Sequence, residues 1–193
     1  MRKNLPFSKN VCAIMSEDRH FNPLVLDNPF RKILDRKDRV LNYVKGDMIV
    51  ADIGCGPGFY TIKLSKIAKT VYAVDSDKKM IDVLNKKIEK LGLKNVVTQV
   101  TSANNLKIES ETVDFVFSNG VLCCMVDHKG AINEIYRILK PKGKAYISVE
   151  TLSKGKTSVS ESEWKELLSR FKIIKEEKKL FTREAIVEKS EED

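Results

Sequence analysis

The sequence predicts an α/β protein with a doubly wound, mostly parallel sheet that closes with an antiparallel hairpin. Between about Asp47 and Val149, short apolar segments alternate with amphipathic helical segments, which is the pattern of a parallel sheet with helices on both faces. The segments Phe171–Lys175 and Leu180–Val187 then follow one another without a helix, and such consecutive strands pair antiparallel. A chain of 193 residues can bury one full core, so we expect one domain over residues 1–193.

The N-terminal part is expected to precede the sheet. Its first 26 residues carry no periodic pattern and are interrupted by Pro6 and Pro23. Asp27-Asn28-Pro29 places an acceptor side chain just before a proline, as at the start of a helix, and apolar spacing continues the helix to about Lys45. We expect residues 1–45 to form a segment and helix that can act as a lid.

The remaining elements follow from local patterns. The expected strands are the apolar segments Met48–Ala51, Val71–Val74, Val96–Val100, Val113–Phe117 and Ala145–Val149. The expected helices are Phe59–Ala68, a second from Ser76 or Asp77 to Gly92, Ala131–Leu139, and a fourth that Ser160 and Glu163 open with capping-box spacing. In the first helix we expect Phe59, Ile62 and either Ile67 or Ala68 to face the core.

Composition and charge narrow the function classes. The net charge is +8, from 35 basic and 27 acidic residues. This positive charge can come from a surface rich in Lys and Glu or from a surface that binds nucleic acid. A nucleic-acid partner therefore stays possible. No apolar run reaches the roughly 20 residues of a transmembrane helix, and no signal peptide is recognisable. We therefore expect a cytoplasmic protein without a membrane partner. The four cysteines form no Cys-x-x-Cys pair, so we expect free thiols and no metal site.

A glycine loop carries the strongest functional signal. Asp52-x-Gly54-x-Gly56-x-Gly58 follows an apolar strand and precedes a helix, where glycine allows a tight turn and the close approach of a ligand to the backbone. The G-x-G-x-x-G pattern of dinucleotide-binding proteins would need a third glycine where Phe59 or Thr61 stands. No G-x-x-x-x-G-K-[ST] motif is present, so a bound triphosphate is not expected.

Asp75 adds a second signal at the end of the next strand. A carboxylate there can accept hydrogen bonds from both hydroxyls of a ribose. The glycine loop and this acid together predict a ligand that contains adenosine. The alternative is that Asp75-Ser76-Asp77 only caps the following helix.

Longer segments extend these two signals. Val50–Thr61, Val71–Asp75 and Glu134–Gly143 together resemble the class I S-adenosylmethionine-dependent methyltransferases, in particular the small prokaryotic type with a methyltransferase-11-like domain. The resemblance extends over roughly residues 27–187. It implies a seven-stranded, Rossmann-like sheet with a reversed last hairpin, and S-adenosyl-L-methionine as the cofactor.

The resemblance also implies a role for each matched residue of the glycine loop. Gly54, Gly56 and Gly58 would surround the methionine part of the cofactor, with Asp52 and the backbone of Cys55 near its amino group.

The other implied contacts come from the ends of the following strands. They are Asp75 at the ribose, Ser76 and Met80 near the adenine, Ser102 and Ala103 at the adenine edge, and Asn119 beside the transferred methyl group. Tyr60, directly after the glycine loop, is placed to touch the cofactor carboxylate. No catalytic residue is assigned, because methyl transfer mainly needs nucleophile, methyl group and sulfur in line.

Two positions depart from the family pattern. Ser102 stands where an aspartate is frequent, so a hydroxyl replaces the carboxylate expected at adenine N6. Cys123 and Cys124 stand where related enzymes often carry histidine. They are either substrate-facing thiols for a soft acceptor such as trivalent arsenic, with Cys12 as third donor, or small buried apolar residues; the spacing favours the latter. His20 is either a base or substrate contact, or a surface or packing histidine.

The sequence therefore predicts an S-adenosylmethionine-dependent methyltransferase that acts on a small-molecule acceptor by direct in-line transfer. No large substrate domain is inserted between the predicted strands, so residues 1–45 and short loops must form the acceptor pocket. One alternative is an RNA or protein methyltransferase, although Ser118–Val121 replaces the Asn/Asp-Pro-Pro-Tyr/Phe signature of many amino-methylating enzymes. The other is a non-catalytic module that binds the cofactor.

Overall fold

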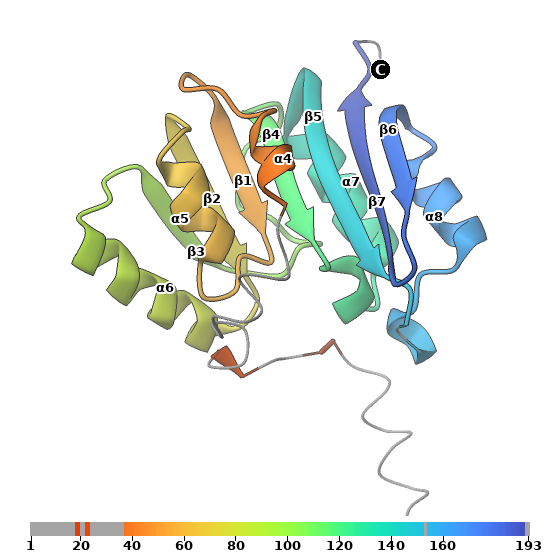
Figure 1. Ribbon diagram of the computed structural model, residues 1–193, viewed down its shortest axis with the longest axis horizontal. Coiled ribbons are helices and arrows are strands. Elements are labelled where there is room, and N and C mark those ends of the chain that lie inside the picture. Colours follow the sequence, from red (N-terminus) through yellow and green to blue (C-terminus); the bar gives the residue numbers. More distant parts are fainter. Residues whose placement is uncertain (1–17, 20–21, 24–36, 153, 192–193) are drawn as a thin grey trace, which may run out of the picture.

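A seven-stranded sheet forms the centre of the molecule (Figure 1). The computed structural model describes residues 18–19, 22–23, 37–152 and 154–191. The strands are β1 (Ile49–Ile53), β2 (Thr70–Asp75), β3 (Val96–Val100), β4 (Val113–Asn119), β5 (Leu139–Glu150), β6 (Phe171–Lys178) and β7 (Thr182–Lys189). They lie in the order β3-β2-β1-β4-β5-β7-β6. Strand β7 is antiparallel to both β5 and β6, while the pairs among β1 to β5 are parallel. The predicted fold class is confirmed.

Helices cover both faces of this sheet (Figure 1). The described helices are α4 (Asp38–Leu41), α5 (Phe59–Ser65), α6 (Lys78–Leu91), α7 (His128–Ile138) and α8 (Glu161–Leu168), with 3-10 turns η1 (Leu122–Cys124) and η2 (Gly155–Thr157). Helices α4, α5 and α6 lie on one face and α7 and α8 on the other. Among the described helices, none is both long and apolar enough to cross a membrane.

Three buried clusters hold the layers together. The largest packs α7 and α8 on the sheet around Trp164 and Ile135. The second lies under α5 on the opposite face and is rich in aromatic rings, with Tyr60, Phe117 and Tyr146 in a row. The smallest, with Ile81 and Leu84, packs α6 on the sheet. Because apolar burial drives folding, these clusters fix the strand ends that carry the polar residues discussed below.

Helix boundaries follow the predicted capping signals. The Asp77 carboxylate accepts a hydrogen bond from the Lys79 N–H and begins α6, and Gly92 ends that helix at φ 62°, a left-handed conformation that favours glycine. The Ser160 hydroxyl accepts a hydrogen bond from the Glu163 N–H at the start of α8. These local signals were sufficient because each involves only neighbouring residues.

The predicted inward face of α5 is confirmed only in part, because Ala68 is buried and Phe59 packs against the buried cluster, but Tyr60 and Leu64 were not expected to face the core. The structure buries Tyr60, Leu64 and Ala68, whereas Phe59 and Ile62 are half-buried and Ile67 is exposed. Apolar residues occur all around this segment, so periodicity alone allowed two faces, and packing of the Tyr60 ring against Phe117 decides between them.

Several predicted boundaries also differ: α5 ends at Ser65 rather than Ala68, α7 begins at His128 rather than Ala131, and β7 begins at Thr182 rather than Leu180. Strand β5 begins at Leu139, six residues before the predicted Ala145, because Leu139 already pairs with Val113 of β4. Of the helix predicted from Pro29 to Lys45, the structure describes only α4, and the residues before Lys37 lie outside the described residues.

The order of the strands positions a ligand site. Strand β1 neighbours β2 on one side and β4 on the other. From β1 the chain therefore continues toward one edge of the sheet through β2 and β3, and from β4 it continues toward the opposite edge, so the order of the strands reverses between β1 and β4. In open α/β sheets ligands bind at this reversal, beyond the carboxyl ends of the strands.

Candidate active site

A cavity of about 450 Å³ lies at the carboxyl ends of the parallel strands, a volume typical of small-molecule sites. Its described lining comes from the ends of β1, β2, β4 and β5, the segment after β3, and the start of β7. In Figure 1 these strand ends point downward. Eight of the twelve predicted cofactor residues line it: Gly54, Gly56, Asp75, Ser76, Met80, Ser102, Ala103 and Asn119.

The glycine loop bends tightly between β1 and α5. Gly54, Gly56 and Gly58 all have positive φ, at 68°, 52° and 87°, a region where residues with a Cβ are strained. A Cβ on Gly54 would lie 2.4 Å from Val121 Cγ2, so space as well as conformation demands glycine there. The N–H groups of Gly54 and Cys55 both donate to the Val74 carbonyl and tie the loop to β2.

Asp75 is held in a fixed orientation beside this loop. Its carboxylate accepts hydrogen bonds from the Gly56 N–H at 2.8 Å and from the Asp77 N–H at 2.9 Å. The helix cap itself is Asp77. Asp75 therefore does more than cap the helix, because it links β2 to the glycine loop and lines the cavity.

Asp52, Cys55, Gly58 and Tyr60 are not among the lining residues. Asp52 is buried beneath the loop, where its Oδ2 accepts a 2.6 Å hydrogen bond from the Thr61 hydroxyl. Burial raises the pKa of Asp52 to about 7; the Thr61 bond opposes this rise and the nearby Asp75 carboxylate adds to it. The Tyr60 hydroxyl accepts a hydrogen bond from the Lys37 N–H, so this phenol faces the N-terminal side of the site.

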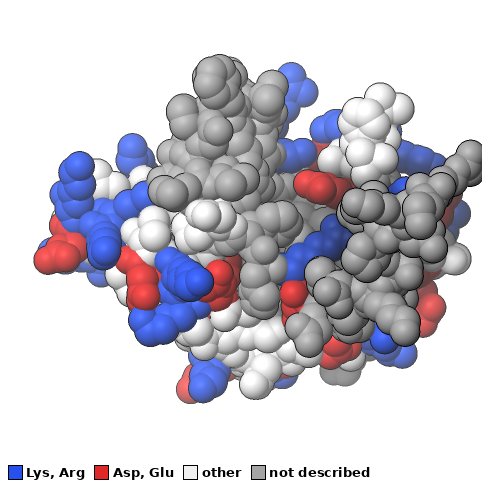
Figure 2. Space-filling model, turned by 90° about the horizontal axis from the view of Figure 1, so that it is seen from below, with Lys and Arg blue, Asp and Glu red and all other residues white. Residues whose placement is uncertain are grey.

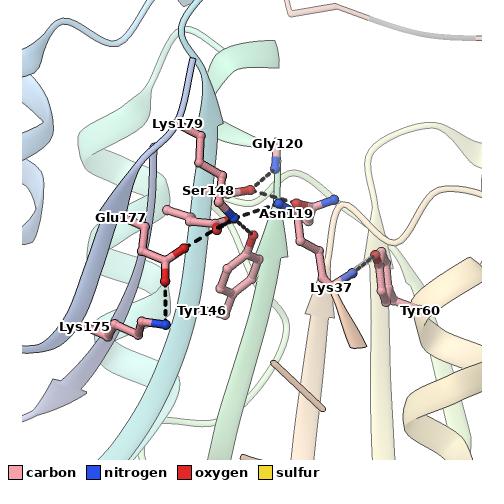
Figure 3. A network of polar contacts seen from close by, with 10 residues as sticks. Lys37, Tyr60, Asn119, Gly120, Tyr146, Ser148, Lys175, Glu177 and Lys179 are labelled. Atoms are coloured by element: carbon pink, nitrogen blue, oxygen red, sulfur yellow. Dashed lines mark hydrogen bonds and ion pairs between the residues drawn. The ribbon is translucent and has the colours of Figure 1, made fainter. Parts of the chain in front are cut away.

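A polar chain joins β4 to β5 at the middle of the cavity (Figure 3). The Ser148 hydroxyl donates to the Asn119 side-chain oxygen at 2.8 Å and accepts from the Gly120 N–H at 3.0 Å. Asn119, Gly120 and Ser148 all line the cavity. The Asn119 amide is therefore fixed by its neighbours rather than free to rotate.

A second network of polar side chains lies next to it (Figure 3). It lies by the part of the cavity lined by Lys37, Glu150 and Thr182, which we call the acceptor side because the acceptor pocket was expected at the N-terminal segment. Lys37, which lines the cavity, contacts the carboxylate of Glu184 on β7 with its Nζ at 2.7 Å. The Tyr146 hydroxyl donates to the same carboxylate at 2.9 Å, and Lys179 also contacts it. Burial raises the pKa of Glu184, but the bonds from Lys179, Lys37 and Tyr146 outweigh burial and lower it to about 2.

Sequence reasoning missed these acceptor-side residues. They include Arg19, Lys37, Ser148, Glu150 and Thr182, all of which line the cavity. Two features of the sequence pointed to their positions without naming them as site residues. Arg19 and Lys37 lie within residues 1–45, which were expected to help form the acceptor pocket, and Ser148 and Glu150 lie at the end of a predicted strand, the edge where ligands bind.

The cysteines and histidines have different surroundings. Cys123 is buried, and its thiol donates to the Gly120 carbonyl at 3.3 Å, which fits the packing interpretation. Cys124 lines the cavity, and its thiol donates to the same carbonyl; the Cys123 thiol and then burial hold the Cys124 pKa far above its usual range. His128 is buried at the start of α7 with its Nδ1 2.6 Å from Glu163. Cys12 and His20 lie outside the described residues, and the described part of the chain contains no group of three or more His, Cys, Asp or Glu residues that could hold a metal ion.

Comparison with known proteins agrees with this geometry. A family model described as "Methyltransferase domain" matches residues 51–147, a range that contains the glycine loop, Asp75 and Asn119. The chain belongs to this methyltransferase family. The eight predicted cofactor residues that line the cavity, from Gly54 to Asn119, all lie within the matched range. The family model and this part of the cavity therefore concern the same part of the molecule.

Individual relatives of this methyltransferase domain differ in length from it. It is 37% identical over 101 residues to an uncharacterised methyltransferase-like protein of Schizosaccharomyces pombe, covering 50% of this chain and 36% of that protein. It is 30% identical over 139 residues to a demethylmenaquinone methyltransferase of Geobacillus sp., covering 69% of this chain and 58% of that protein. The chain thus spans only about a third to three fifths of these curated relatives. A solved S-adenosylmethionine-dependent methyltransferase from Aquifex aeolicus superposes with a TM-score of 0.74 and 27% identity over 88% of this chain and 99% of that one.

Proposed function

We propose that this chain transfers the methyl group of S-adenosyl-L-methionine to a small-molecule acceptor at the carboxyl edge of the sheet. The observation that carries the proposal is one cavity that joins the glycine loop, the Asp75 carboxylate and the ends of β4 and β5. A ligand with a charged, a sugar and an aromatic part fits its walls. Its lining includes the loop backbone at Gly54 and Gly56, the Asp75 carboxylate, and the apolar side chains of Met80 and Ala103.

The residues of the chain bind and orient rather than take part covalently. The cofactor would supply an electrophilic methyl group on a sulfonium sulfur. The glycine loop lets the backbone approach the ligand closely, and Asp75 is positioned to accept the ribose hydroxyls because two N–H groups fix its carboxylate. Asn119, fixed by Ser148, marks the place between cofactor side and acceptor side. Such alignment accounts for most of the catalysis that a methyl transfer needs.

A small acceptor is supported by the size of the cavity and by the names of relatives. The whole cavity measures about 450 Å³, and the cofactor would fill much of it. The Geobacillus relative is named for a small-molecule acceptor, demethylmenaquinone. We therefore place the acceptor between Lys37, Cys124, Met125 and Glu150, on the far side of Asn119.

The RNA alternative is less well supported by the charge distribution. Many of the described lysines pair with carboxylates, as in Lys78–Asp82, Lys144–Glu188 and Lys178–Glu161. In the face drawn in Figure 2, acidic side chains lie among the basic ones. A surface of mixed sign contributes less to phosphate binding than an unbroken basic stripe.

Titration calorimetry with S-adenosylmethionine and S-adenosylhomocysteine tests the cofactor. Replacing Asp75 by Ala should weaken binding by about 1–3 kcal/mol, since hydrogen bonds to a charged group are lost. The matched control is Asp82→Ala, which removes an exposed carboxylate on α6 that pairs with Lys78 and should leave binding unchanged. Equal affinity of the Asp75→Ala variant and the parent protein would contradict the ribose role.

A second experiment separates the activities. Methyl-labelled cofactor is incubated with pools of small metabolites, total RNA and proteins, and the labelled fraction is identified. Label in small molecules supports the proposal, whereas salt-sensitive label in RNA supports the first alternative. Tight cofactor binding with no label in any pool supports the non-catalytic module.

A further inference from the structure

We propose that the mouth of the acceptor side docks on an anionic lipid surface. Three segments wall this side of the cavity, and each carries an exposed apolar side chain next to a lining residue. Val126 follows the lining residue Met125, Leu152 lies two residues beyond Glu150, and Leu180 and Phe181 precede Thr182. The exposed fractions are 82% for Leu180, 65% for Leu152 and 53% for Phe181.

Three of these apolar residues lie side by side. Strands β5 and β7 pair with Glu150 opposite Thr182, and the Thr151 N–H donates to the Phe181 carbonyl at 2.9 Å. The turn that follows β5, which carries Leu152, therefore lies against the turn between β6 and β7, which carries Leu180 and Phe181 (Figure 1). Single exposed apolar residues are ordinary, but a group of them at one place marks an interaction site.

Basic side chains lie near this apolar tip, formed by Leu152, Leu180 and Phe181, although the exposed Glu150 lies there too. Lys154 and Lys156 are exposed and have no ion-pair partner among the residues that the structure describes. The Arg19 guanidinium donates to the Lys154 carbonyl, so a third cation lies close by. Lys178 and Lys179 also flank the turn, although they pair with Glu161 and with Glu177 and Glu184. Figure 2 shows this edge of the sheet, where acidic side chains lie among the basic and uncharged ones.

A lipid surface is the partner that this combination fits. Apolar side chains that project beyond a basic rim insert between lipid headgroups, while the cations attract anionic lipids. A stable protein interface usually buries about 800 Å² on each partner, which is far more than three side chains offer. The sequence pointed away from a membrane partner because no segment can span a bilayer, but docking of this kind needs no spanning helix.

Docking in this orientation would turn the cavity mouth toward the bilayer. An acceptor that partitions into lipid could then enter the cavity without crossing water. This last consequence rests on the proposed function, whereas the docking itself does not.

Co-sedimentation with vesicles tests the proposal on the full chain. The probes are vesicles of phosphatidylcholine alone and of equal parts phosphatidylcholine and phosphatidylglycerol. We expect the parent protein to sediment with the second kind only, and high salt to release it. The double variant Leu180→Asp/Phe181→Asp should lower the partition coefficient by roughly tenfold or more. Lys154→Glu/Lys156→Glu should lower it by more than tenfold, since each basic residue near the surface contributes about a fivefold factor.

The matched control is Leu91→Asp on α6. Leu91 is 53% exposed, like Phe181, and follows Lys90, but it lies away from the cavity lining. This variant should sediment like the parent protein. Thermal unfolding of each variant confirms that it is folded.

Several outcomes would overturn the docking proposal. They are no sedimentation of the parent protein with either vesicle, equal loss in the Leu91→Asp control, and self-association that Leu180→Asp/Phe181→Asp abolishes without any vesicle binding. The last of these would assign the tip to a second copy of the chain. Calorimetry with the cofactor on the same samples is read separately, so failure of cofactor binding with intact vesicle binding would count against the proposed function alone.

Discussion

Two buried carboxylates flank the cavity, and their pKa values move in opposite directions. On the cofactor side, burial raises the pKa of Asp52 to about 7, against the hydrogen bonds from the Thr61 hydroxyl and backbone. On the acceptor side, Glu184 is also buried, yet two ammonium groups and the Tyr146 phenol lower its pKa to about 2. Burial alone therefore does not set the charge of an acid in this protein. The donors that reach it decide the outcome.

The same contrast holds for how each side is built. The cofactor side consists mainly of residues close together in the sequence, from Gly54 to Met80, with Ser102 and Ala103 added from the segment after β3. The acceptor side joins distant parts of the chain, such as Lys37 to Glu184 and Asp18 to Val126. One side rests on backbone conformation and the other on side-chain networks, and variants of each should fail differently.

The largest effect is expected on the cofactor side, for Gly54→Ala. The new Cβ would meet Val121 Cγ2 at 2.4 Å in a residue with φ 68°, and left-handed backbone costs a residue with a Cβ about 1–2 kcal/mol before any overpacking of about 1–3 kcal/mol. We expect the free energy of unfolding to fall by about 2–5 kcal/mol and cofactor binding to be lost. Denaturant unfolding and calorimetry measure the two effects.

The control for conformation alone is Gly92→Ala. Gly92 has a similar φ of 62°, but a Cβ there would meet nothing within 4 Å. This variant should lose only about 1 kcal/mol and bind cofactor normally. Equal losses in both variants would show that the contact with Val121 is unimportant.

The next largest effect is expected on the acceptor side, for Glu184→Gln. The amide keeps one acceptor for Tyr146 but leaves the poorly exposed ammonium of Lys37 without its counter-charge. We expect a loss of about 2–3 kcal/mol in unfolding free energy. Glu188→Gln on the same strand, which removes the more peripheral pairs with Lys144 and Lys172, should cost less than about 1 kcal/mol.

Acid titration gives this prediction a second measurement. Because the folded pKa of Glu184 lies below its ordinary value of 4.5, its stabilisation is present above pH 4.5 and is lost as the pH falls toward about 2. Glu184→Gln should flatten the stability curve in that window only. If the unfolding free energy of the variant and the parent protein fell equally between pH 4.5 and about pH 2, the acid-dependent stabilisation would come from groups other than Glu184.

Asp52→Asn should act in the opposite direction and in a different pH window. The folded pKa of Asp52 lies above its ordinary value of 3.8, so the folded state holds the proton more tightly. The parent protein should therefore lose stability as the pH rises from about 4 to about 7. The asparagine variant lacks this slope because an amide does not titrate. Its side-chain oxygen can still accept the hydrogen bond from the Thr61 hydroxyl. At pH 8 we expect it to be about 3–4 kcal/mol more stable than the parent protein, relative to their difference at pH 4. Parallel stability curves for the two proteins would contradict the raised pKa.

The contrast between the two sides also explains how far the sequence could be interpreted. The strands, the helix caps and the glycine loop depend on neighbouring residues, so local patterns predicted them. The inward face of α5 was predicted only in part because its apolar residues surround the helix, and only the contact of Tyr60 with Phe117 selects a face.

The acceptor side could not be predicted because its contacts are long-range. Lys37 and Glu184 are separated by 147 positions, and the sequence around either residue does not predict its contact with the other. Their encounter depends on β7 inserting between β5 and β6, which a pattern of two consecutive strands does not specify. The buried acid and its cations become visible only once the sheet order is known.

The smallest expected effect lies where the two sides meet, at Ser148. Its hydroxyl donates to Asn119 and accepts from Gly120, but the Gly120 N–H also donates to the Ser148 carbonyl at 3.1 Å. Ser148→Ala therefore removes the donor to Asn119 while Gly120 keeps a partner, and we expect a loss of about 1 kcal/mol in unfolding free energy. If Asn119 aligns cofactor and acceptor as proposed, methyl transfer should slow several-fold while the dissociation constant of the cofactor stays unchanged. Ser169→Ala, which removes a hydroxyl bonded to the Glu166 carbonyl at the end of α8, is the control and should leave the transfer rate unchanged. Weaker cofactor binding with an unchanged rate would instead place Asn119 wholly on the cofactor side, and the division of the cavity at this residue would have to move toward β5.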